Sequence, residues 1–239
     1  DRTIFNLAGE WKKQRFVADD NITLDNRDTE GLTNLITEAA NRHLYIYDES
    51  SWETKTLPAV ENTMNPYPTV PEYYQDGVWY RKRFNISASQ TDAFVKLMFY
   101  SVNYVADVWL NDVYLGYHEG GYTPFAFDVT SALNYNGENI IVVRVDNPYW
   151  NSRNDIVPYT ACDWFNYTGI IHDVYLEFSH SVSVLRTNIV PQNVNGDFQT
   201  SVVISNDMDV TKNVSVDVEV FEADINENNF NAESASEIV

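Results

Sequence analysis

The sequence contains a single cysteine, Cys162, so no disulfide can form within the chain. No histidine lies near Cys162 in the sequence, and we interpret it as an incidental small residue and not as a catalytic thiol. The few glycines form no Gly-rich phosphate-binding loop. No apolar run approaches the roughly 20 residues of a membrane-spanning helix, which indicates a soluble chain with no membrane partner.

Basic residues are scarce in this sequence. The chain has 15 lysines and arginines against 35 aspartates and glutamates, which gives a formal net charge of −20. Such a field repels phosphate backbones, so we expect no nucleic acid as a partner. It also disfavours polyanionic glycans and anionic membrane surfaces. The simplest interpretation of the charge is solubility.

Metal ligands are also few. The four histidines, His43, His118, His172 and His180, are scattered without the spacing of a zinc site, and we expect neither a metal ion nor another cofactor. The sequence begins at Asp1 and shows no secretory signal. Because it has no initial methionine, a leader could have been removed, and a secreted or periplasmic location is left open.

Apolar and aromatic residues, in contrast, are plentiful. They make up 44% and 14% of the chain, which is ample for a packed core. A length of 239 residues fits one large β-domain and part of another.

Short segments rich in aromatic and β-branched residues recur along the chain, with turn residues between them. In one of them Tyr80, Phe84 and Ile86 share a face with the stem of Lys82, as alternate residues of a strand do. The repeated pattern predicts an all-β fold, a jelly-roll β-sandwich. The predicted strands cover residues 4–7, 11–16, 79–86, 94–100, 104–110, 113–115, 125–129, 140–145 and 173–178.

Other local signals predict a hairpin, a long loop and one helix. Asn111 and Asp112 predict a tight hairpin, because both residue types tolerate left-handed backbone geometry. Four prolines between residues 58 and 71 predict a long irregular loop. Helical spacing of apolar residues predicts one short helix. These apolar residues are Leu32, Leu35, Ile36, Ala39 and Ala40.

A domain boundary is predicted near His180 and Ser181, with one domain at 1–180 and a second at 181–239. In the second domain, residues 182–190 and 198–204 are predicted to form strands. The valines between residues 214 and 220 alternate with polar residues, which predicts a strand with one buried face. About four strands cannot close an immunoglobulin-like sandwich, which needs about seven, so we expect a truncated domain. The tail at 222–239 is acidic and has little core material.

The segment 163–170 combines one acidic side chain, an amide and several aromatic residues, and a predicted strand follows it. A carboxylate accepts hydrogen bonds from sugar hydroxyls, and aromatic rings cover the apolar C–H face of a sugar. The segment holds no nucleophile with an activating base. It therefore predicts a binding surface and not a catalytic centre.

Seven blocks, in order, resemble the N-terminal sugar-binding domain of glycoside hydrolase family 2, the family of β-galactosidases, β-glucuronidases and β-mannosidases. The blocks are residues 51–52 with 57–58, 78–84, 106–111, 118–125, 128–130, 143–147 and 163–175. The resemblance covers roughly residues 5–180. It implies a galactose-binding-domain-like jelly roll, then an immunoglobulin-like domain, and a catalytic (β/α)₈ barrel beyond residue 239 as the partner of both. The resemblance leaves open whether the full-length enzyme forms a homo-oligomer.

In this family, hydrolysis uses two glutamates that the barrel carries, so the resemblance implies no catalytic residue in this chain. Asp163 aligns with the residue that the family's N-terminal domain extends toward the sugar; the alternative is a turn-capping aspartate. Trp164 is balanced between stacking on a sugar and filling the core. Asn65 lies in the proline-rich loop, from which some members send an asparagine to the same site. Asn166 is interpreted as holding the loop in shape.

The block that starts at His118 and Glu119 suggests acid/base or metal chemistry, but we interpret it as structural, with Gly120 and Gly121 supplying a backbone bend. Our first hypothesis is that the chain is the non-catalytic N-terminal portion of a retaining β-glycosidase. A free-standing carbohydrate-binding module and a purely structural domain are the alternatives. The sugar itself is not predicted, because barrel residues set that specificity.

Overall fold

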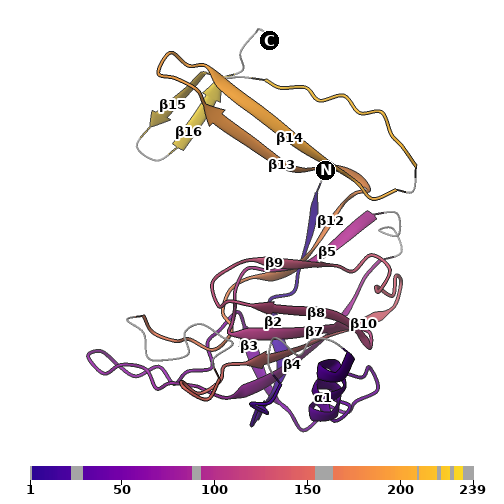
Figure 1. Ribbon diagram of the computed structural model, residues 1–239, viewed down its shortest axis with the longest axis vertical. Coiled ribbons are helices and arrows are strands. Elements are labelled where there is room, and N and C mark those ends of the chain that lie inside the picture. Colours follow the sequence, from indigo (N-terminus) through magenta and orange to yellow (C-terminus); the bar gives the residue numbers. More distant parts are fainter. Residues whose placement is uncertain are drawn as a thin grey trace. The chain divides into compact units, whose positions relative to one another are not determined.

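The computed structural model describes residues 2–22, 29–87, 93–153, 164–208, 210–219, 222–226 and 229–233 (Figure 1). The chain divides into two compact units, Asp1–His180 and Ser181–Val239. The first unit contains two large antiparallel sheets and one helix.

The larger sheet of the first unit has six strands in the order β3-β2-β4-β10-β7-β8. Every neighbouring pair is antiparallel. The strands are β3 (Glu53–Leu57), β2 (Gly9–Phe16), β4 (Gly77–Asn85), β10 (Glu138–Asp146), β7 (Val105–Leu110) and β8 (Val113–Glu119).

The smaller sheet has four strands in the order β1-β12-β5-β9, also antiparallel. They are β1 (Thr3–Asn6), β12 (Val174–His180), β5 (Ala93–Phe99) and β9 (Phe125–Asp128). A short pair, β6 (Val102–Asn103) with β11 (Gly169–Ile170), forms a two-stranded sheet of its own.

One face of each sheet supplies the main core. Alternate residues of β4, Tyr80 and Phe84 among them, pack in one cluster with alternate residues of β5 and β12, such as Leu97 and Leu176. The predicted face of β4 is confirmed, since Tyr80, Phe84 and Ile86 are all buried there. Two antiparallel sheets that share a core form a β-sandwich, which confirms the predicted all-β sandwich class.

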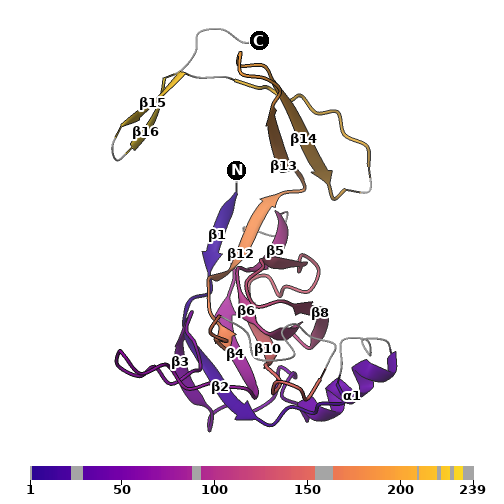
Figure 2. The ribbon, with the colours of Figure 1, turned by 60° about the vertical axis from the view of Figure 1, so that its left-hand side comes forward.

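The other face of the six-stranded sheet is covered by the helix α1 (Thr29–Ala39), as Figures 1 and 2 show. Leu35 and Ala39 of α1 pack against Trp79, Trp109 and Val142 of the sheet in a second buried cluster. The helix lies where the apolar spacing predicts it. Among the described residues, no helix is long and apolar enough to cross a membrane.

Buried charges join α1 to the sheet. Arg144 on β10 is fully buried and donates to Glu38 of α1 at 2.5 Å, to Asp107 at 3.2 Å and to Asp146 at 3.4 Å. A buried guanidinium needs such partners, because leaving it unpaired costs several kcal/mol. Asp146 also accepts from Arg153 at 2.9 Å, so the charged cluster extends to the end of the 93–153 segment.

Two local predictions can be compared with the backbone directly. Asn111 and Asp112 connect β7 to β8 with φ of 49° and 71°, which confirms the tight hairpin. The edge strand β3, in contrast, is not predicted by the sequence. Only Leu57 of its five residues is buried, so β3 carries little apolar periodicity.

The second unit contains two hairpins, β13 (Val182–Pro191) with β14 (Phe198–Asn206) and β15 (Glu222–Asn226) with β16 (Asn229–Glu233). The predicted strand at 214–220 is wrong for its described part, since residues 210–219 contain no strand. Val214, Val216 and Val218 are 50%, 46% and 39% exposed. Alternation creates an apolar face, but burying that face requires a second sheet against it. The hairpin β15–β16 was not expected in the acidic tail.

Candidate functional site

The sequence predictions place a sugar-binding loop before β11. Asp163 and Cys162 lie outside the described residues. Trp164 is the first described residue after them and is 48% exposed, so it does not fill the core. Asn166, two residues further, is buried.

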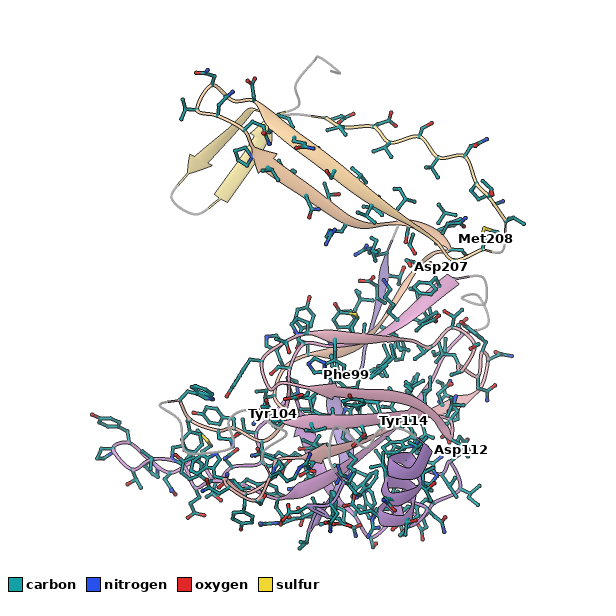
Figure 3. The ribbon with its side chains drawn as sticks, viewed as in Figure 1. Phe99, Tyr104, Asp112, Tyr114, Asp207 and Met208 are labelled. Atoms are coloured by element: carbon teal, nitrogen blue, oxygen red, sulfur yellow. The ribbon has the colours of Figure 1, made fainter. Side chains whose placement is uncertain are left out.

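Trp164 and Asn166 line a cavity of about 200 Å³. The cavity lies at the start of β7, next to Tyr104. Asp112 follows the opposite end of this strand (Figure 3). Its walls come from three places: β6 and the residue after it, the β8–β9 connection, and the segment before β11. Within the part of the chain that the structure describes, none of the lining side chains is charged. They belong to Asn103, Tyr104, Gly120, Gly121, Tyr122, Thr123, Trp164 and Asn166.

A group of buried polar side chains, here named the asparagine cluster, lies behind this cavity. It consists of Asn62, Asn103, Asn147, Asn166 and Thr168, and every member is 6% exposed or less. Asn166 Oδ1 accepts from Asn103 at 2.6 Å and from Asn147 at 3.3 Å, and Asn166 Nδ2 donates to Asn147 Oδ1 at 3.2 Å. Buried amides need such partners, because an unsatisfied group costs about 1–3 kcal/mol.

The asparagine cluster connects segments that are distant in the sequence. Asn62 donates to the backbone oxygen of Asn166 at 3.1 Å and accepts from the amide of Thr168 at 2.8 Å. Asn147 donates to the hydroxyl of Thr168 at 2.6 Å. Asn103 donates to the backbone oxygen of Tyr167. The segment 166–168 is therefore fixed on three sides, as the sequence interpretation of Asn166 expects.

Glu61 fixes the start of the long loop that contains Asn62. Its carboxylate is 2.7 Å from Lys13 and 3.1 Å from Lys55, and it accepts from the Tyr80 hydroxyl at 2.6 Å. Burial favours the neutral form of this carboxyl, but the hydrogen bonds of Lys13 and Tyr80 and the nearby lysine charges outweigh it and hold the pKa of Glu61 below its usual value. The base of the loop is thus tied to β2, β3 and β4.

Aromatic rings hold the same loop to the segment before β11. Tyr73 stacks on Phe165 with ring centroids 4.7 Å apart and nearly parallel planes, and it meets Trp150 edge-on at 4.9 Å. Phe165 also contacts Tyr167 at 4.7 Å. Such ring pairs contribute about 0.5–1.5 kcal/mol each beyond their buried area. Phe165, the residue that follows Trp164, is therefore in contact with Tyr73 of the long loop and with Tyr167 of its own segment.

Asn65 lies farther out in the loop between β3 and β4, which projects away from the sandwich in Figures 1 and 2. Its Nδ2 donates to the backbone oxygen of Val70 at 3.1 Å, which closes the tip of the loop. Asn65 does not line the cavity, so the structure does not bring it together with Trp164 there. Tyr67 at the tip is 97% exposed.

His118 and Glu119 make local contacts. The His118 ring stacks on Phe125 at 4.2 Å, and its Nε2 lies 2.9 Å from Thr123 Oγ1. Burial lowers the pKa of His118. Glu119 accepts from the Tyr104 hydroxyl at 3.2 Å. Across the described segments, no group of three or more His, Cys, Asp or Glu side chains is arranged to hold a metal ion.

Sequence reasoning did not identify Asn103, Tyr104 and Tyr122 as cavity residues. Tyr122 lies in the recognised block 118–125, yet nothing in its sequence context distinguishes an exposed ring from a buried one. In the structure Tyr122 is 55% exposed and its hydroxyl donates to the backbone oxygen of Phe165 at 3.2 Å. The signal that was available is its aromatic character beside two glycines.

Comparison with known proteins places these observations in a family. A model of the glycosyl hydrolases family 2 sugar binding domain matches residues 4–179. A putative β-glucuronidase of Formosa agariphila is 35% identical over 130 residues, which cover 54% of this chain and 15% of the relative. A β-galactosidase of Thermoanaerobacter pseudethanolicus is 34% identical over 140 residues, covering 58% of this chain and 18% of the relative. The chain thus spans less than a fifth of the length of these two relatives.

Solved structures share the fold. A Ruminococcus gnavus β-glucuronidase in complex with N1-substituted uronic isofagomine matches with a TM-score of 0.64 at 20% identity, covering 86% of this chain and 35% of that one. A Bacteroides uniformis β-glucuronidase matches with a TM-score of 0.57 at 23% identity, over 79% and 19% of the two chains. Because the family model matches well over half of the sequence, the chain belongs to glycosyl hydrolases family 2, and residues 4–179 are its sugar binding domain.

Proposed function

We propose that this chain is the non-catalytic sugar-binding part of a retaining β-glycosidase, and that the loop of Asp163 and Trp164 forms one wall of the sugar pocket. The observation that carries the proposal is the half-exposed Trp164 ring beside a cavity, on a segment that the asparagine cluster fixes at Asn166. The family of the chain and the relatives named β-glucuronidase and β-galactosidase support a β-glycoside as the substrate.

The chemistry divides between this chain and a catalytic barrel of the same polypeptide. Retaining hydrolysis needs two carboxyl groups about 5–5.5 Å apart, one as acid/base and one as nucleophile. We assign both to the barrel and no catalytic residue to this chain. The role of Asp163 is to accept hydrogen bonds from hydroxyls of the sugar ring that is attacked, and the role of Trp164 beside it is to cover the C–H face of a sugar ring of the same substrate. Fixing the substrate in this way places the glycosidic bond for attack.

The test is Asp163→Ala in the polypeptide that carries the barrel. A hydrogen bond to a charged group contributes about 1.5–3 kcal/mol, so kcat/KM should fall by about 10- to 100-fold while the melting temperature is retained. Asp173→Ala is the control, because Asp173 is an exposed aspartate just before β12 and does not line the cavity. Equal kinetics for Asp163→Ala and the parent would remove this role.

The chain by itself separates the proposal from its alternatives. We expect the purified 239 residues to release no nitrophenol from aryl β-glycosides, and measurable release would contradict a non-catalytic role. The cavity beside Trp164 favours a second candidate, a free-standing carbohydrate-binding module. Titration calorimetry with methyl β-glycosides distinguishes the two: micromolar binding by the isolated chain supports the module, whereas a pocket that needs the barrel predicts binding too weak to measure.

We further propose that residues 1–180 form the jelly-roll domain and that residues 181–239 begin an immunoglobulin-like domain. In the second unit an open apolar groove of about 520 Å³ lies between the β13–β14 hairpin and residues 216–219. Phe198 in this groove is 43% exposed. Such a face is what half of a β-sandwich presents before its second sheet is added. The likeness to the Ruminococcus gnavus structure also covers more of the chain than residues 1–180 make up.

A further inference from the structure

We propose that the cavity between Tyr122 and Trp164 is a subsite for one uncharged sugar ring of the leaving group. The inference rests on the proposed function, because it assigns the ring that adjoins the one held by Asp163. The described walls and floor of the cavity come from residues of this chain. The ring whose bond is attacked must instead lie against the catalytic pair of the barrel, so the cavity suits its neighbour in the substrate.

The size of the cavity suits a single ring. Its volume of about 200 Å³ holds about seven waters at roughly 30 Å³ each. Pockets for drug-sized ligands start at about 300 Å³. An extended oligosaccharide therefore places only one of its rings here.

Two half-exposed aromatic side chains line the cavity. Trp164 is 48% exposed and Tyr122 is 55% exposed, and they come from the segment before β11 and from the β8–β9 connection. The hydrogen bond from Tyr122 to the backbone oxygen of Phe165, at 3.2 Å, joins these two segments. The spacing of the two walls is therefore set by the fold before a ligand arrives, which lowers the entropy cost of binding.

The floor of the cavity is equally fixed. Asn103 and Asn166 are held by each other and by the rest of the asparagine cluster. A Cβ atom added to Gly121 would lie only 1.9 Å from Asn103 Oδ1, so the β8–β9 connection packs directly on the Asn103 side chain. The hydroxyl oxygens of Tyr104, Tyr122 and Thr123 can accept hydrogen bonds from sugar hydroxyls.

The charge of the cavity determines the class of ring. None of the described side chains that line it carries a charge, and the chain as a whole has a net charge of −20. A carboxylated ring would enter without a cationic partner and against a negative field, which is unfavourable. A neutral pyranose, with its C–H face on Trp164 or Tyr122, needs no cationic partner and is not repelled by the negative field.

The experiment compares leaving groups in the polypeptide that carries the barrel. For the glycone that this enzyme cleaves, kcat/KM is measured with a neutral disaccharide and with the methyl β-glycoside, and their ratio is recorded for each variant. Tyr122→Ala and Trp164→Ala should each lower the ratio by about tenfold, as expected for the loss of an aromatic contact. Tyr122→Phe and Trp164→Phe keep a ring and should retain most of it.

Tyr117→Ala is the matched control, because Tyr117 on β8 is 40% exposed and does not line the cavity. Its ratio should equal that of the parent. An unchanged ratio in both Tyr122→Ala and Trp164→Ala would overturn the subsite, and so would an equal preference for a disaccharide whose leaving ring carries a carboxylate. The proposed function has a separate test. Asp163→Ala should lower kcat/KM for the disaccharide and for the methyl glycoside alike, and an unchanged kcat/KM would contradict the proposed function.

Discussion

Asn103 donates from Nδ2 to Oδ1 of Asn166 at 2.6 Å, between residues 63 positions apart in the sequence. This bond joins the strand β6 to the segment that follows Trp164. Both side chains are buried. The candidate sugar-binding loop is therefore held from the interior by an amide pair, in addition to the contacts that Tyr73 and Tyr122 make with Phe165.

The first prediction concerns the asparagine cluster, tested through its member Asn147. Asn147→Ala removes donors to Asn166 and Thr168 and leaves buried groups unsatisfied, so the free energy of unfolding should fall by about 1–3 kcal/mol. The amide of Thr168 should also exchange faster with deuterium in the native state, because local opening becomes easier. In the barrel-containing polypeptide, kcat/KM should fall further than the loss of stability explains.

Asn139→Ala provides the comparison. Asn139 is fully buried and accepts from Asn111 and from the amide of Asn134, each at 2.7 Å. These contacts lie beside the β7–β8 hairpin, at the end of β7 marked by Asp112 in Figure 3 and away from Tyr104. A similar loss of stability is expected without faster exchange at Thr168. If Asn147→Ala and Asn139→Ala accelerated the exchange at Thr168 and lowered kcat/KM to the same extent, the asparagine cluster would have no specific positioning role.

The second prediction concerns the buried carboxylate of Glu61. Glu61→Gln keeps the size of the side chain but removes the buried anion that Lys13 and Lys55 share, so urea denaturation at pH 7 should show a loss of about 3 kcal/mol. Glu53→Gln is the control. Glu53 also pairs with Lys13, at 3.3 Å, but its side chain is 78% exposed, and exposed pairs contribute little.

The same residue gives stability a defined dependence on pH. The pKa of Glu61 is lower in the folded chain than its ordinary value of 4.5, so the unfolded chain takes up a proton first as the pH falls. The stabilisation is therefore complete above pH 4.5 and is lost as the pH falls toward the folded pKa. The difference in unfolding free energy between the parent and Glu61→Gln should shrink over this acidic range, and a constant difference would contradict the assignment.

Much of the first unit follows from the sequence because its strands are rich in aromatic and β-branched residues. Buried and partly buried positions alternate on β5, whereas β4 is buried on both faces, with Tyr80 in the core between the sheets and Trp79 in the cluster that includes α1. The apolar residues of α1 repeat at helical spacing. The strand β3 could not be predicted, since pairing with β2 stabilises it and its own pattern does not. The valines at 214–218 show the converse: alternation is local, whereas burial depends on a sheet elsewhere in the fold.

The candidate site was less predictable for a related reason. Trp164 was identified from its chemistry, but the choice between core and surface depends on tertiary packing that no local pattern encodes. Tyr122 reaches the same cavity from a connection more than 40 residues earlier, through a bond to the Phe165 backbone. Asn65 was predicted as a site residue because it lies in the proline-rich loop. In the structure its amide closes the tip of that loop.

The third prediction concerns His43, which is 8% exposed and packs 5.8 Å from Trp109. Burial lowers its pKa below 6.5; Asp112 opposes this shift, and Arg81 adds to it. The folded chain therefore binds fewer protons than the unfolded chain as the pH falls through 6.5, and stability is lost in that window. His43→Phe should remove this part of the pH dependence between pH 7 and 5. Parallel curves for parent and variant would contradict it.

The last prediction concerns the independence of the first unit. Among the described residues, all members of the buried apolar clusters lie between Leu7 and Phe178, so we expect the cooperative core to belong to residues 1–180. A chain of residues 1–180 should therefore unfold in one transition, at a temperature within about 4 °C of that of residues 1–239, since roughly 1 kcal/mol corresponds to such a shift. Scanning calorimetry of both chains measures it. A much lower melting temperature for residues 1–180 would mean that residues 181–239 belong to the same cooperative unit, and the proposed boundary at His180 would then be wrong.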